Sequence, residues 1–134
     1  MRSTLADLAF EMGLIGLAAA LFHYGLAVRS LNRLIRSKSP IWAGAWAGAL
    51  VFVAVAALHA WGRFALFPRL AGLETKITEA TAGLRLSELD LLQARFDEIL
   101  SLMGNLRALS FAGVLLGSLL ALAAGASFLR ATSK

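Results

Sequence analysis

The most regular pattern of hydrophobic positions lies in the second half of the chain. Large apolar residues recur there at alternating spacings of three and four, at Leu89, Leu92, Phe96, Ile99, Met103 and Leu106. This spacing is that of a heptad seam, the apolar face along which one helix packs against another. Ser87 and Asp90 form a start similar to a capping box just before it. We therefore predict an amphipathic helix that begins near Ser87.

The same helix is expected to continue into a membrane-length apolar run. No charged residue occurs between Arg107 and Arg130, and the 22 residues 108–129 would measure about 33 Å as a helix, enough to cross a hydrocarbon core of about 30 Å. Small residues recur every four positions in this run, at Gly113, Gly117, Ala121 and Gly125. Such a glycine stripe lets a second helix approach closely. The heptad seam and the three glycines are the predicted helix-packing interface, with a partner helix in the same chain or in another.

Two further uncharged runs precede this helix. Residues 12–28 carry no charge, and the run extends to about residue 8 if Glu11 lies at the membrane interface. Residues 41–62 are also uncharged, with tryptophans towards both ends and a small patch at Gly44 and Gly48. The predicted membrane spans are therefore residues 8–28, 41–62 and 108–129.

A basic segment, residues 29–40, separates the first two spans. It contains Arg29, Arg33, Arg36 and Lys38 and is expected to form a short interfacial helix that ends at Pro40. Such a cluster is typical of a cytoplasmic loop. The same four cations are also a candidate site for anionic lipid headgroups. The same cations can serve both roles, so the two interpretations are compatible.

The segment between the second and third spans, residues 63–107, is expected to form a helical hairpin outside the membrane. Leu70, Leu73 and Ile77 indicate an amphipathic arm, with Pro68 bending or ending the helix before them and Gly83 at the turn. Arms 63–82 and 87–107 are nearly equal in length, so the hairpin closes without a long loop.

Bulk composition agrees with a membrane protein. The 134 residues are 59% hydrophobic with a net charge of +5, and the mean hydropathy is +0.74. We expect a single membrane domain over residues 1–134, an all-α integral membrane protein with three transmembrane helices and an extramembrane amphipathic hairpin between the second and third. Placing the basic loop in the cytoplasm of a bacterial-type inner membrane puts the N-terminus outside and the C-terminus inside. The positive charge is explained by this topology, so no nucleic-acid partner is expected.

No pattern typical of catalysis or of a cofactor site accompanies these elements. The three runs contain no Asp, Glu, Lys or Arg, and the chain has no cysteine, phosphate-binding loop or paired metal ligands. His23 and His59 would lie about 15–20 Å apart along the membrane normal, too far apart to ligate one haem iron. We expect neither an enzyme nor a bound cofactor.

The sequence favours a small non-catalytic membrane protein that acts as an assembly, scaffold or accessory subunit through helix–helix packing. Its expected partners are membrane lipids and either further copies of itself or a larger membrane complex. A homo-oligomeric pore is the first alternative. The predicted topology of the chain is similar to that of phage holins, with three spans, an outside N-terminus and a short basic tail. The hairpin is larger than that plan requires. A haem- or quinone-associated subunit is the second alternative.

Overall fold

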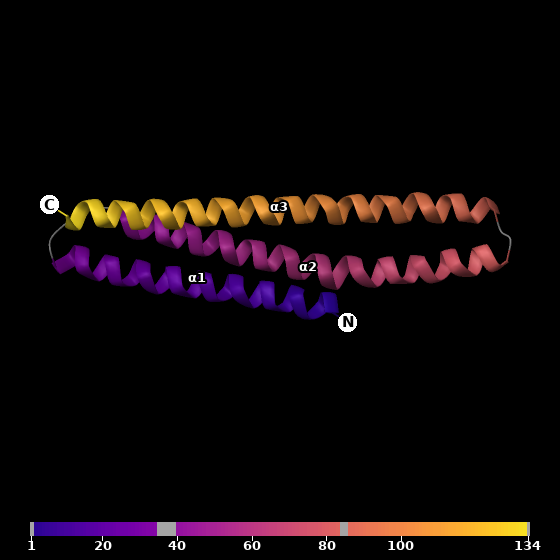
Figure 1. The fold of residues 1–134 in the computed structure, drawn as a ribbon, viewed down its shortest axis with the longest axis horizontal. Helices are drawn as coiled ribbons and strands as arrows, with labels where there is room; N and C mark the ends of the chain where they lie inside the picture. Colours follow the sequence, from indigo (N-terminus) through magenta and orange to yellow (C-terminus); the bar gives the residue numbers. More distant parts are fainter. Residues whose placement is uncertain (1, 35–39, 84–85, 134) are drawn as a thin grey trace. The chain divides into compact units, whose positions relative to one another are not determined.

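The computed structural model describes residues 2–34, 40–83 and 86–133, and nearly all of them are helical. They form α1 (Arg2–Leu34), α2 (Ile41–Ala82) and α3 (Leu86–Thr132), drawn in Figure 1. Each helix contains a stretch long and apolar enough to cross a membrane. The expected all-α class is confirmed, and the three candidate spans indicate a multi-pass membrane protein.

Helix α1 is longer than the predicted first span and includes part of the expected basic loop. It continues through Arg29 and Arg33 to Leu34, so these arginines belong to the last turns of α1 and not to a separate interfacial helix. The reason is that no glycine or proline interrupts residues 26–34. Arg36 and Lys38 lie outside the described residues.

Helix α2 passes through Pro68 without ending. Proline removes a single N–H donor, here the one that would bond to the carbonyl of Phe64. Apolar residues after it, Leu70, Leu73 and Ile77, remain half-buried in the continuing helix. Near the C-terminal end of α2, the N–H of Gly83 donates to the carbonyl of Glu79 at 2.9 Å, which places a turn at Gly83 as expected.

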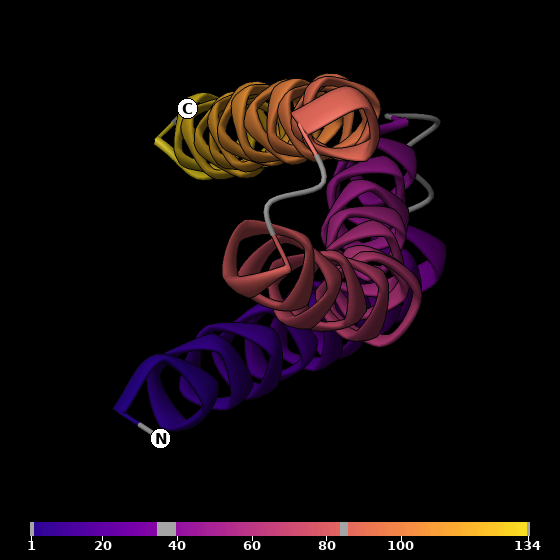
Figure 2. The ribbon, with the colours of Figure 1, turned by 90° about the vertical axis from the view of Figure 1, so that its right-hand side faces the viewer.

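The chain divides into two compact units: unit 1 is Met1–Ala57 with Phe111–Lys134, and unit 2 is Leu58–Ser110. In unit 1, α2 packs against both α1 and α3 (Figure 2), and Tyr24 of α1 meets Phe128 of α3 edge to face with ring centres 6.1 Å apart. The core of unit 1 combines small and large apolar side chains from α1 and α2, namely Leu14, Ala18, Ala49, Phe52, Val55 and Ala56. The alanines among them allow the two helices to approach closely.

Unit 2 consists of two antiparallel helical segments, the end of α2 and the start of α3, which lie side by side (Figure 1). Leu66 and Ala80 of α2 are buried in this unit. The unit begins and ends close to the limits expected for the hairpin, residues 63 and 107. Its position outside a membrane remains a prediction.

Candidate functional site

The heptad seam forms the partly covered face of α3 in unit 2. All six seam residues are half-buried, whereas Leu91, Leu100 and Leu102 between them are 60%, 44% and 45% exposed. The facing positions of α2 follow the same spacing: Leu66, Leu70, Leu73, Ile77 and Ala80 are buried or half-buried. The structure therefore places the seam against the second helix of the same chain.

The glycine stripe divides into two parts in unit 1. Gly117 is buried, and a Cβ atom added to it would lie 2.9 Å from Cε1 of Phe52 in α2. A Cβ atom at Gly113 would overlap the side chain of Val55 in the same helix. Gly125, in contrast, has no atom within 4 Å of the corresponding position. Two members of the stripe thus serve the close contact of α2 with α3, and the third is open.

Gly48 completes this contact from the α2 side. A Cβ atom added to Gly48 would lie 3.4 Å from the carbonyl oxygen of Gly117 and 3.2 Å from a methyl group of Leu21. Glycine on both helices brings the two backbones together, which is the role of small residues in membrane helix pairs. The sequence shows the small patch at Gly44 and Gly48, but only the fold shows that it faces the glycine stripe.

A cluster of aromatic side chains surrounds Arg29 in unit 1. The guanidinium carbon lies 5.2 Å from the ring centre of Trp42 and 5.6 Å from that of Trp46. The two indoles meet edge to face at 5.1 Å, and Phe22 stacks on Trp46 at 5.4 Å. Both distances from Arg29 are within the range of cation–π attraction. The basic end of α1 is thereby joined to the start of α2.

Gly25 is the residue that makes room for this cluster. It is buried, and a methyl group added to it would overlap the indole of Trp46. The indole N–H of Trp46 is buried and has no hydrogen-bond partner among the described residues. The role of Gly25 cannot be predicted from the sequence, because an isolated glycine in an apolar run carries no positional signal without knowledge of the facing helix.

The remaining predicted lipid-binding cations are only partly described. Arg33 is exposed at the end of α1, while Arg29 is half-buried by its tryptophans. Arg36 and Lys38 lie outside the described residues. The structure thus gives two different environments to the arginines of this group, one packed on aromatic rings and one open.

The two histidines lie in different compact units, His23 in unit 1 and His59 in unit 2. His23 is exposed beside Phe22 and borders an apolar hollow of about 410 Å³ between α1 and α2. Within residues 2–34, 40–83 and 86–133, no group of three or more His, Cys, Asp or Glu side chains is placed to hold a metal ion.

Comparison with protein-family models, with curated proteins and with solved structures finds no match to this chain. The function is therefore inferred from the packing faces themselves.

Proposed function

We propose that this chain is a non-catalytic membrane protein that acts as a scaffold or accessory subunit through helix–helix contacts. The observation that carries the proposal is the packing face of α3. Positions covered by other parts of the chain recur at heptad spacing beyond Leu106, at Ser110, Gly113, Gly117, Leu120 and Ala124. One helix of 47 residues thus combines a membrane-length segment with an amphipathic segment on a single packing face. This design supports a structural role.

The proposed setting is a bacterial-type inner membrane, with the N-terminus outside and the C-terminus in the cytoplasm. Arg29 and Arg33 end α1 beside the start of α2, where a cytoplasmic basic cluster would lie. Unit 2 would then stand outside the membrane as a helical hairpin. Trp42 and Trp46 support an interfacial position for this end, because tryptophan favours the headgroup level. Of the two described arginines at this end, Arg33 is the exposed one, and we propose it as a contact for an anionic lipid headgroup.

The experiment that tests the proposal is purification of the tagged chain, at low expression, from membranes of its own host. A scaffold or accessory subunit should be recovered with another membrane protein, or with further copies of itself, in a fixed ratio by native mass spectrometry. Cell growth and membrane potential should stay normal. Collapse of the membrane potential on induction would contradict the proposal in favour of a pore. A Soret absorbance band in the purified protein would contradict it in favour of a haem subunit.

A further inference from the structure

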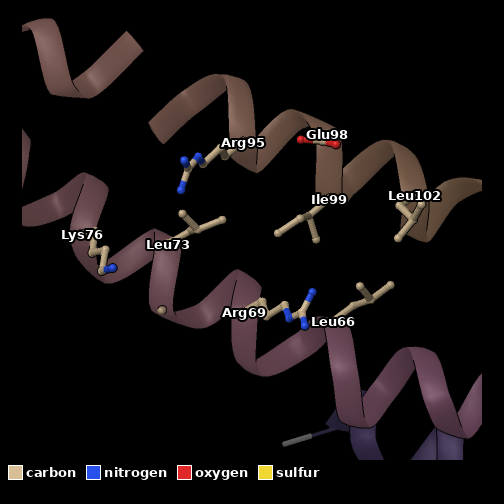
Figure 3. A pocket seen from close by; sticks show the side chains of 9 residues that line it. Leu66, Arg69, Leu73, Lys76, Arg95, Glu98, Ile99 and Leu102 are labelled. Carbon is tan, nitrogen blue, oxygen red and sulfur yellow. The ribbon is translucent and has the colours of Figure 1, made fainter. Parts of the chain in front are cut away.

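A groove runs between the two helices of unit 2. Its apolar floor is formed by Leu66 and Leu73 of α2 with Ile99 and Leu102 of α3, and the hollow measures about 560 Å³. Figure 3 shows these side chains facing one another from the two helices. Leu66 and Leu73 are seven residues apart, so the floor repeats once per heptad along the helix axis. This spacing matches that of the apolar stripe of an amphipathic helix.

The groove is also longer than this hollow. A second hollow of about 450 Å³ continues towards Gly83 and shares Lys76 with the first. From Leu66 to Gly83 the distance along α2 is about 26 Å, the length of a helix of about 18 residues. An amphipathic helix that docks in a groove contacts it along one face, at spacings of three, four and seven residues.

The walls of the first hollow are basic. Arg69 and Lys76 come from α2 and Arg95 from α3, against the single carboxylate of Glu98. Figure 3 shows Arg69 and Arg95 extending into the space between the helices. These three cations form no ion pair with a carboxylate of the described residues. The first hollow thus offers unneutralised positive charge beside an apolar floor, whereas Glu79 and Glu88 line the second hollow.

A second copy of the chain fits this groove poorly. Two copies in one membrane, related by a twofold axis along the unit 2 helices, would present the same face to each other. Arg69, Lys76 and Arg95 of one copy would then meet the same three residues of the other. Juxtaposed like charges oppose such an interface, so charge complementarity selects a different occupant.

We propose that the groove of unit 2 binds an amphipathic helix of a partner protein, one whose apolar stripe is flanked by glutamate or aspartate where it passes Arg69, Lys76 and Arg95. This inference rests on the proposed scaffold function and specifies the chemistry of the partner. The apolar floor supplies the docking surface, and the three cations select acidic over basic helices.

The test uses the full chain in lipid nanodiscs and a synthetic helix of about 18 residues. The peptide carries leucine at spacings of three and four, flanked by glutamate in one half and by glutamine in the other. A matched peptide has lysine in place of every glutamate. We expect the glutamate peptide to bind and the lysine peptide not to bind, by fluorescence anisotropy.

Charge reversal in the groove locates the site. Arg95→Glu should weaken binding of the glutamate peptide about two- to fivefold, and Arg69→Glu with Arg95→Glu about tenfold, while the double variant gains affinity for the lysine peptide. Arg107→Glu is the control, because Arg107 is exposed on the same helix and does not line the groove. Its binding should equal that of the unmodified chain.

Four results would overturn the inference. The two peptides could bind equally, or neither could bind. Peptide binding could be insensitive to Arg69→Glu and Arg95→Glu. Vesicles containing phosphatidylglycerol could bind through these arginines in place of the glutamate peptide, which would assign the cations to lipid. If the peptide fails to bind but a membrane partner still co-purifies with the double variant, only this inference fails and the scaffold function stands.

Discussion

At the scale of single residues, the closest contacts of unit 1 depend on glycines that face large side chains. Gly25 lies against Trp46, and Gly113 and Gly117 lie against Val55 and Phe52. In each pair, the neighbouring side chain occupies the space that a Cβ atom of the glycine would take. Other glycines of the same helices are open, which provides matched controls.

Gly117→Leu should destabilise the packing of α2 against α3. Phe52 is only 2% exposed and has little room to move, and overpacking of this kind costs about 1–3 kcal/mol. Gly125→Leu should leave the stability within about 0.5 kcal/mol, since no atom lies within 4 Å of its Cβ position. Unfolding in mixed detergent micelles measures the change in stability for both variants. Equal effects of the two substitutions would show that the glycine stripe does not divide as described.

Gly25→Ala should lower stability by a similar amount, about 1–3 kcal/mol. The added methyl group should displace the Trp46 indole from its stack with Phe22, and the carbonyl oxygen of Trp42 also lies only 3.3 Å from the same position. Gly16→Ala, at an open position of the same helix, should be neutral or slightly stabilising, because alanine favours helix more than glycine does. Tryptophan fluorescence should shift for Gly25→Ala alone. An unshifted spectrum would contradict the described position of the indole.

At the scale of elements, the heptad seam gives adjacent residues of similar size different degrees of burial. Ile99 is on the seam and half-buried, whereas Leu100 is off it and 44% exposed. Ile99→Ala should therefore destabilise unit 2 more than Leu100→Ala does, by about 1–2 kcal/mol, as expected for a partly buried aliphatic side chain. The difference can be measured by hydrogen exchange of residues 58–110. A larger effect of Leu100→Ala would place the packing face of α3 elsewhere.

Pro68 interrupts the hydrogen bonding of α2 without ending the helix. Pro68→Ala restores the donor for the carbonyl of Phe64 and should stabilise the surrounding turns by about 1–3 kcal/mol. Hydrogen exchange at residues 64–72 should slow accordingly. Ala71→Gly, at an exposed position one turn further on, should speed exchange, since glycine costs about 1 kcal/mol in a helix. Unchanged exchange in Pro68→Ala would indicate that α2 is already open there.

A packing face can be predicted from the sequence only where its apolar positions contrast with charged positions on the other faces of the helix. The heptad seam is visible because charged residues such as Asp97 and Arg107 surround it. Helix α1 also has covered positions at heptad spacing, Leu14, Ala18, Leu21, Gly25, and Val28. They are hidden in the sequence because the run is apolar on every side. The contact of Arg29 with Trp42 and Trp46 joins two helices, and no spacing within either one encodes it.

At the scale of the whole molecule, the three long helices provide packing faces, and the described residues show no metal cluster. Many side chains of unit 1 remain exposed and apolar, among them Leu115, Leu119 and Leu122 of α3. In a membrane these faces meet lipid or a partner helix. In unit 2, by contrast, charged side chains such as Glu74, Asp97 and Arg107 are exposed alongside apolar ones such as Phe64 and Leu109.

The central claim is that the two helices of unit 2 pair within one chain and so leave a groove for a partner. The absence of native cysteine allows a direct measurement: Leu73→Cys with Ile99→Cys, joined in intact membranes by a short bismaleimide and separated on a denaturing gel. We predict an internally cross-linked monomer, with much less of it when Leu100→Cys replaces Ile99→Cys. A covalent dimer as the main product would contradict pairing within one chain, because the seam would then join two copies.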